Sequence, residues 1–327
     1  MAAATTTNSI LVLGAGELGH AILSSLLANP RYNTPSAPTT ITLLVRPATL
    51  AHPGEAKLKQ QNSYRAQGVR LVAGDIDADD EATLTDIFRP YSTVIHAGGM
   101  NSPAGTITKI TRAVLAAVVK LYMPWQHGVN YDAIGRDGGE GLFSEQVDVR
   151  DLLRSQSATQ WVIVSCGIFM SFLFEEYWGV VVKKQQAVGE GGSAGQEGTR
   201  IRVTALNSWD DIITVTTAED IGRCAAELVL DSDAPRDRPV YIAGDTLTYR
   251  AFADTLQSVT GVEVVRDVWP VDYLRELSRN DPDDKLKKYR VVFAEGTGLS
   301  WPVEGTWSSE RGFEMQRVAD WVRKNYC

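Results

Sequence analysis

A short stretch near the N-terminus places an apolar run, three glycines and an amphipathic run next to one another. Segment 8–14, NSILVLG, is typical of a buried strand, and 17–29, ELGHAILSSLLAN, has the spacing of a helix with one apolar face. Glycines between them in the pattern G-x-G-x-x-G allow a tight turn, close approach of a pyrophosphate and close helix–strand packing. The helix N-terminus offers free N–H groups to an anion. The stretch therefore predicts a dinucleotide site formed by Gly14, Gly16, Glu17, Leu18 and Gly19.

The same alternation continues through the first half of the chain. Amphipathic runs of helix length, including 104–120, separate further apolar runs. Those apolar runs, of strand length, lie at 39–45, 68–75, 92–99, 121–125 and 159–167. Continuous apolar strands separated by helices indicate a parallel sheet covered on both faces. We therefore expect an α/β fold with a Rossmann doubly wound parallel sheet.

The pattern changes after Gly167. Short strand-like runs at 199–206 and 210–216 follow or lie near the low-complexity stretch 187–198, which we interpret as a mobile loop. The remaining helical and strand-like runs predict a smaller C-terminal α/β lobe. We place the cofactor-binding domain at 1–166 and the smaller lobe at 167–327, interleaved, with some C-terminal elements returning to the sheet.

Charge and cysteine content limit the classes of partner. The 327 residues carry a net charge of −8 without a basic cluster, which argues against a nucleic-acid partner. The three cysteines have no metal-type spacing, so we expect no metal and a reducing compartment. The N-terminus lacks the pattern of a signal peptide, and the longest apolar run, 161–174, is too short to span a bilayer. We expect a cytoplasmic protein, monomeric or homodimeric, with a small-molecule substrate and no membrane partner.

The choice of dinucleotide is also readable. Sites that prefer NAD place a carboxylate about 20 residues after the glycines, on the ribose 2′-hydroxyl. Here no acidic residue occurs between Glu17 and Glu55, and the second strand is followed by Arg46. A guanidinium can bind a 2′-phosphate through two hydrogen bonds, although Arg46 can also be an ordinary solvated arginine. We predict NADP(H), with Ala97 and Gly98 after the fourth strand leaving room for the cofactor.

The loop 123–139, MPWQHGVNYDAIGRDGG, concentrates polar and aromatic side chains among glycines. Trp125, His127 and Tyr131 lie within seven positions of one another in it. A solvated loop has no need of two aromatic rings and an imidazole so close together. The loop therefore predicts a site.

Several stretches resemble the isoflavone-reductase-like, NmrA-like branch of atypical short-chain dehydrogenases. They include GAGELG, LLVRP, PWQHGVNYDAIGR, LFSEQVDVRDLLR, WVIVSCGIFMSFLF and VTTAEDIG, and the resemblance covers nearly the whole chain. It looks closest to fungal members of secondary-metabolite pathways. The resemblance implies a Rossmann domain that binds NADPH and a small substrate lobe. It also implies that the loop, with Pro124 and Gln126, passes the nicotinamide.

The acid–base chemistry departs from the relatives. The Tyr-x-x-x-Lys motif of typical short-chain dehydrogenases is missing from the expected region, and Gln146 stands where plant isoflavone-type reductases carry a lysine. Glutamine donates a hydrogen bond but transfers no proton at ordinary pH. His127 is the remaining acid–base candidate, because its ordinary pKa is near neutrality. A lone histidine is more often structural. Gln146, as a hydrogen-bond donor, and Tyr131 complete the predicted catalytic residues, although Tyr131 either touches the substrate or holds the loop.

An aromatic segment follows the sixth strand and matches the family's substrate wall. Phe169, Phe172 and Trp178 lie in it, and Trp125 of the loop has the same character. Each ring alone is as readily explained by the hydrophobic core. Together they favour a bulky planar substrate.

Three functions remain open. The first is an NADP(H)-dependent oxidoreductase that reduces a C=N, C=C or C=O bond of a bulky aromatic or alkaloid-like secondary metabolite. The second is a cofactor-dependent cyclase of the redox-mediated Diels–Alder type in fungal alkaloid biosynthesis. The third is a non-enzymatic regulator that senses NADP(H), against which the aromatic wall argues.

Overall fold

The computed structural model describes residues 8–32, 34, 38–99, 102–185 and 199–326. The chain divides into two compact units. Unit 1 comprises Met1–His127, Glu145–Val164 and Ile221–Val240, and unit 2 comprises Gly128–Ser144, Ser165–Asp220 and Tyr241–Cys327. A single boundary after residue 166 therefore does not describe how the units interleave, and the assignment of a function to each part stays a prediction. The loop expected at 187–198 lies outside the described residues.

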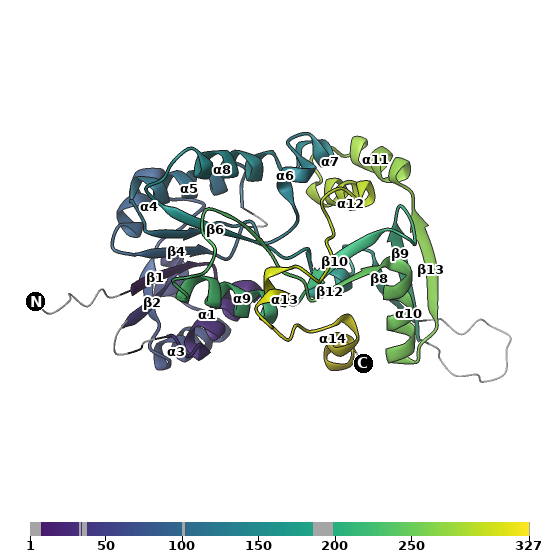
Figure 1. Cartoon of the computed structure of the whole chain (residues 1–327), viewed down its shortest axis with the longest axis horizontal. Helices are drawn as coiled ribbons and strands as arrows, with labels where there is room; N and C mark the ends of the chain where they lie inside the picture. The colour runs from purple at the N-terminus through teal and green to yellow at the C-terminus, as the bar shows by residue number, and fades with distance from the viewer. Residues whose placement is uncertain (1–7, 33, 35–37, 100–101, 186–198, 327) are drawn as a thin grey trace, which may run out of the picture. The chain divides into compact units, whose positions relative to one another are not determined.

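Unit 1 is built on a seven-stranded sheet (Figure 1) with the order β11-β6-β5-β4-β1-β2-β3. All neighbouring pairs from β6 to β3 are parallel. The strands are β1 (Asn8–Leu13), β2 (Thr39–Val45), β3 (Arg70–Ala73), β4 (Thr93–His96), β5 (Leu121–Met123), β6 (Gln160–Ser165) and β11 (Arg238–Tyr241). The order from β3 to β6 is that of the Rossmann doubly wound fold, so the predicted fold class is confirmed. β11 is the C-terminal element that returns to the sheet.

Helices cover both faces of this sheet, with α4, α5 and α8 on one side in Figure 1 and α1, α3 and most of α9 on the other. They are α1 (Glu17–Ala28), α2 (Pro47–Ala51), α3 (Glu55–Ala66), α4 (Glu81–Phe88), α5 (Thr106–Ala116), α8 (Ser144–Arg154) and α9 (Ala218–Leu230). One core joins α4, α5 and α8 to the sheet through buried side chains such as Leu84, Ile110 and Val149. On the other face a Cβ added to Gly222 would lie 2.6 Å from the Ala21 carbonyl carbon, so α9 packs directly on α1.

Several predicted elements are longer than the observed ones, and for two of them the structure shows the cause. The run expected at 121–125 forms a strand only to Met123, because Pro124 has no N–H for the ladder. The helix expected at 104–120 ends at Ala116. Its chain is turned by Val118, whose φ of 53° lies in the left-handed region.

Unit 2 contains two three-stranded sheets, β12-β10-β7 and β13-β9-β8. Their strands are β7 (Ile168–Phe169), β8 (Val181–Gln185), β9 (Thr199–Leu206), β10 (Ile212–Thr216), β12 (Asp245–Thr248) and β13 (Val264–Trp269). The helices are α6 (Tyr131–Ile134), α7 (Gly138–Gly141), the 3₁₀ helix η1 (Ser171–Phe174), α10 (Tyr249–Thr260), α11 (Val271–Arg279), α12 (Lys285–Glu295), α13 (Trp307–Glu310) and α14 (Val318–Asn325). Within the described residues, no helix has the length and apolar character needed to cross a membrane.

Candidate cofactor and active site

The glycine loop joins β1 to α1, and each glycine meets different surroundings. Gly14 has φ +104°, and a Cβ there would lie 3.0 Å from the Gly98 backbone nitrogen. A Cβ on Gly19 would lie 2.1 Å from the Gly14 carbonyl oxygen. A Cβ on Gly16, by contrast, meets no atom within 4 Å, so the protein itself gives no reason for a glycine there. The open space at the start of α1 fits a pyrophosphate group.

The other predicted cofactor residues surround this loop. Glu17 is exposed in the first turn of α1, whereas Leu18 is buried. Ala97 is 3% exposed and, with Gly98, follows β4 where it passes Gly14. Pro124 follows β5, the next strand in the sheet. Their contacts with a cofactor stay predictions.

Arg46 lies between β2 and α2 and is the N-cap residue of α2. Its Nη2 lies 2.7 Å from Oδ2 of Asp77 and its Nε 3.7 Å from Oδ2 of Asp75, and its side chain is 62% exposed. Lys109 donates to the backbone carbonyls of Asp77 and Asp79 at 3.1 and 2.7 Å, which braces the segment that carries the carboxylates. A phosphate bound by Arg46 would have to replace or tolerate Asp77, which sequence spacing alone did not indicate.

Two histidines and a tryptophan form a cluster at the carboxyl ends of β4 and β5. The ring centroids of His96 and Trp125 are 6.3 Å apart, and those of Trp125 and His127 are 5.9 Å apart. His96 is 0% exposed and His127 6% exposed. Among the described residues, none of the four imidazole nitrogens makes a hydrogen bond of good geometry, although the backbone of Gly98 lies near the His96 ring and the backbone of His96 lies near the His127 ring. Buried polar atoms without a partner are costly and rare, so these nitrogens are candidates for binding a ligand.

Burial keeps both imidazoles neutral at ordinary pH. It lowers the pKa of His96 to about 3, helped by repulsion from His127. It lowers the pKa of His127 to about 4, although the nearby backbone of His96 opposes this shift. Neutral imidazole has one N–H donor and one acceptor nitrogen. His127 can therefore orient or hydrogen-bond a substrate, but near pH 7 it holds no imidazolium proton to give away.

The loop between Trp125 and His127 is held from α8. Nε of Arg150, which is fully buried, donates to Oε1 of Gln126 over 2.7 Å, and Nε2 of Gln126 donates to the backbone carbonyl of Gln146 over 2.9 Å. The Oε1 of Gln146 is buried without a partner among the described residues. Gln126 thus has a structural role, whereas the catalytic role predicted for Gln146 stays a prediction. Glu145, beside it, accepts from the backbone N–H groups of Gly105 and Thr108 and so caps α5.

Tyr131 and Phe143 belong to unit 2. Tyr131 is 4% exposed and its ring lies 4.8 Å from that of Phe143. A Cβ on Gly128 would lie 2.5 Å from the Tyr131 hydroxyl oxygen, so the tyrosine lies over this glycine of the loop. This packing gives Tyr131 a part in holding the loop, and its catalytic role stays a prediction.

The aromatic segment of unit 2 has an exposed and a buried side. Phe169 and Phe172 are half-buried, whereas Trp178 is 0% exposed. The ring of Phe172 lies 5.0 Å from Trp178, which also contacts Phe293 at 5.6 Å. Trp178 therefore supports Phe172 from within the core. Direct substrate contact by Phe169, Phe172 and Trp178 stays a prediction.

The sheet order and the glycine loop define a protein of the Rossmann dinucleotide-binding class. The model of the NmrA-like family matches residues 6–312, and the chain belongs to that family. An NmrA-like family domain-containing oxidoreductase of Gibberella moniliformis is 38% identical over 97% of this chain and 98% of its own. A crystal structure of isoflavone reductase has a TM-score of 0.73 at 18% identity, covering 98% of this chain and 99% of that one.

An NADPH complex of the Escherichia coli quinone oxidoreductase QOR2 has a TM-score of 0.67 at 20% identity. It covers 97% of this chain and 100% of that one. At this level of identity the two structures demonstrate a shared fold. Among the described residues, no group of three His, Cys, Asp or Glu side chains is placed to hold a metal ion.

His96, Arg150 and Asp77 are residues of the candidate site that the sequence patterns did not indicate. His96 was visible as an unusual last residue of a buried strand, and Arg150 as a charge on the apolar face of a helix. The partners of Arg150 and Asp77 lie 24 and 31 positions away along the chain, and only the fold brings them together.

Proposed function

We propose that this chain is an NADP(H)-dependent oxidoreductase that reduces a bulky aromatic or alkaloid-like metabolite, with a C=N group as the preferred acceptor. The observation that carries the proposal is the buried cluster of His96, Trp125 and His127 at the carboxyl ends of β4 and β5. None of its four imidazole nitrogens makes a hydrogen bond of good geometry among the described residues. The oxidoreductase from Gibberella moniliformis supports the redox assignment. The NADPH bound to QOR2 supports the choice of cofactor.

The cofactor supplies hydride when it is bound, and the chain's own residues explain how it is held. The open space at Gly16 would receive the pyrophosphate, and the close contact of Gly14 with Gly98 keeps the loop in place. Arg46 would bind the 2′-phosphate by giving up its ion pair with Asp77. These roles agree with NADP(H) rather than NAD(H).

The neutral state of His127 favours an acceptor that needs no proton. A ketone that accepts hydride becomes an alkoxide, which must be protonated, and neither a neutral imidazole nor Gln146 is a strong acid. An iminium carbon that accepts hydride becomes an amine carbon, and the nitrogen gains its electron pair without a proton. A neutral imidazole also avoids the repulsion that an imidazolium would exert on a cationic substrate.

A cofactor-dependent cyclase is the second candidate. The same observation favours it, because a buried apolar site with neutral hydrogen-bonding groups suits a cycloaddition that transfers no proton. Half-buried Phe169 and Phe172 are the candidate surface for a planar substrate. As a cyclase, the protein would catalyse ring formation in an alkaloid or other secondary-metabolite pathway, with no net consumption of NADPH.

The test incubates the protein with NADPH and a dihydroisoquinolinium salt, with the matching bicyclic ketone, a tetralone, as comparison. NADPH absorbance and product are followed together. We expect reduction of the iminium salt with stoichiometric NADPH oxidation, slower reduction of the ketone, and about tenfold slower turnover for His127→Ala, as for loss of one hydrogen bond. His52→Ala, at an exposed histidine, is the matched control.

Other outcomes contradict the proposal in distinct ways. A faster reaction with the ketone overturns the preferred acceptor. Ring formation from a tethered diene without net NADPH oxidation favours the cyclase, and tight NADPH binding with no turnover of either class favours a regulator that senses the cofactor. Full activity of His127→Ala with the iminium salt removes the histidine from the site.

A further inference from the structure

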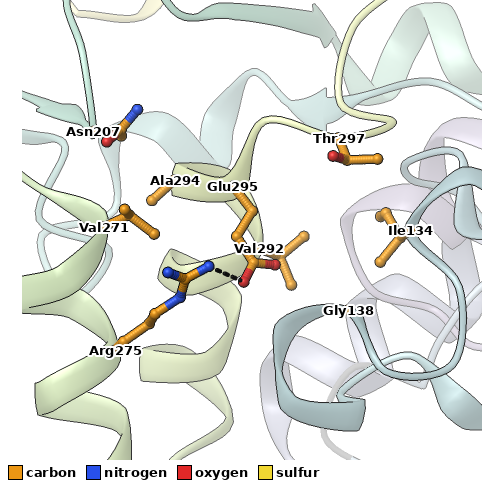
Figure 2. Close-up of a pocket in the computed structure, with 9 residues that line it drawn as sticks. All are labelled: Ile134, Gly138, Asn207, Val271, Arg275, Val292, Ala294, Glu295 and Thr297. Carbon is orange, nitrogen blue, oxygen red and sulfur yellow. Dashed lines mark hydrogen bonds and ion pairs between the residues drawn. The ribbon is translucent and has the colours of Figure 1, made fainter.

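A cavity of about 470 Å³ lies within unit 2 and includes none of the residues assigned above to cofactor or substrate. Figure 2 shows Ile134 and Thr297 on one side, Asn207 and Val271 on the other, and the side chains of Arg275 and Glu295 between them. Its volume lies within the range of cavities that bind small molecules. The cavity thus has the size for a ligand of two or three rings.

The positive charge of Arg275 in this cavity is balanced by two nearby carboxylates, those of Glu295 and Asp272. Arg275 donates through Nη2 to Oε1 of Glu295 at 3.1 Å, and its Nη1 lies 3.6 Å from Asp272. The cation is therefore already neutralised, so an anionic ligand would have to compete with two carboxylates. A cationic ligand would have to compete with Arg275 for Glu295. A neutral ligand meets neither cost.

Polar groups with unused hydrogen-bonding capacity line the same space. Glu295 accepts from Arg275 and, through Oε2, from the backbone N–H of Gly139 at 3.3 Å, and a carboxylate has further acceptor positions. Asn207 uses its amide N–H₂ on Asp211 at 2.9 Å, which leaves its amide oxygen as an acceptor. Ile134, Val271 and Val292 supply the apolar surface. A ligand with hydroxyl or amide donors on an apolar ring system complements these groups.

The cavity also contacts the loop that continues from His127. Ile134 and Gly138 belong to the segment Gly128–Ser144, which packs on α12: a Cβ on Gly139 would lie 2.0 Å from Cγ2 of Val292. The backbone of Asn130 donates to the carbonyl of Gly298 at 2.9 Å. A ligand in the cavity would therefore touch the loop and α12 together.

We propose that this cavity is a binding site for a neutral, hydroxylated or amide-bearing ring compound, separate from the proposed site of hydride transfer. Glu295 and Asn207 accept hydrogen bonds from the ligand, and the side chains of Ile134, Val271 and Val292 contact its rings. Occupancy of the site braces the segment Gly128–Ser144 against α12. This inference goes beyond the proposed function and does not depend on turnover.

The test is a titration of ¹⁵N-labelled protein with 7-hydroxycoumarin, followed by amide chemical shifts, against a coumarin carboxylate as the anionic counterpart. We expect saturable shifts at Ile134, Gly138 and Thr297 with the neutral probe and weaker binding of the carboxylate. Glu295→Gln removes the nearer of the two carboxylate charges beside Arg275. The neutral probe should then bind about tenfold more weakly and the carboxylate more tightly, which reverses the selectivity. Glu304→Gln, at an exposed glutamate of the same unit, is the control.

A second variant, Val271→Phe, places a larger side chain in the cavity. Val271 is the first residue of α11 and is half-buried. Circular dichroism checks that each variant is folded. Loss of the shifts in folded Val271→Phe supports the site. Unchanged binding to that variant, an unaltered selectivity in Glu295→Gln, or no saturable shift in the parent protein each overturns the proposal. None of these results depends on NADPH.

Discussion

At the scale of single residues, the most informative side chain is Arg150. Removing a guanidinium from water is costly unless hydrogen bonds replace the lost hydration, and Arg150 is 0% exposed. Arg150 holds Gln126 in place through a hydrogen bond, and Gln126 lies between Trp125 and His127, two members of the buried cluster. Arg150 is therefore a positioning residue for the proposed site, acting through Gln126.

We expect Arg150→Met to lower kcat about tenfold while the Kd for NADPH stays the same, because the loop shifts and the glycine loop does not. The imidazole NMR signals distinguish a positioning role from a merely structural one. The chain has only four histidines, so each signal can be assigned. The signals of His127 should move in the variant. Arg154→Met, at an exposed position at the end of α8, should change neither quantity. Unmoved His127 signals with a normal kcat would contradict the role.

At the scale of elements, α5 is followed by Val118, which adopts a left-handed backbone conformation that valine disfavours. The N–H of Val118 donates to the Leu115 carbonyl at 3.1 Å and that of Val119 to the Val114 carbonyl at 3.4 Å. This pattern is a Schellman motif, in which the left-handed position is usually glycine. Here it is Val118, a β-branched residue with φ 53° and 65% exposure.

We expect Val118→Gly to raise the free energy of unfolding by about 1 kcal/mol. Glycine relieves the left-handed strain, which outweighs the added freedom of the unfolded chain, and no buried contact is lost. Val119→Gly should destabilise the protein, because Val119 is 1% exposed. Urea unfolding of the two variants measures both effects. A less stable Val118→Gly protein would show that the strain estimate is wrong.

At the scale of the whole molecule, the two buried imidazoles make stability depend on pH. The unfolded chain takes up protons on these histidines below about pH 6.5, while the folded protein takes them up only near the lowered pKa values of about 3 and about 4. Stability is therefore lost as the pH falls through this window, by about 1.4 kcal/mol per pH unit for each histidine.

Urea unfolding at about pH 7 and about pH 5 tests this dependence. Carboxylates also titrate at low pH, so the comparison is between the parent protein and His96→Gln. The variant should lose less stability over the interval, by about 1.4 kcal/mol for each unit below pH 6.5. Equal losses in the two proteins would mean that His96 is protonated normally in the folded state.

Local sequence patterns predicted the sheet and the glycine loop. The side-chain pairings and the burial of individual residues depend on tertiary contacts, which local patterns do not show. The Rossmann order follows from alternating runs and the chirality of crossovers, which act over short stretches of chain. By contrast, the pairing of Arg46 with Asp77 and of Gln126 with Arg150 of α8 depends on contacts between segments that the fold brings together. The burial of Trp178 likewise depends on α12, more than 100 positions away, through Phe293. The functional roles of the site residues stay predictions.

A calorimetric titration of the protein with NADPH and with NADH tests the cofactor preference most directly. We expect tighter binding of NADPH, with a difference that falls by about 1 to 2 kcal/mol in Arg46→Ala, since this arginine is more than half exposed. Asp77→Asn should strengthen NADPH binding by removing a competing carboxylate. Gly16→Val should fold, because no atom lies within 4 Å of the added Cβ, yet lose both cofactors. Equal affinities for NADPH and NADH in the parent protein, or full binding by Gly16→Val, would mean that Arg46 and the glycine loop do not form an NADP(H) site.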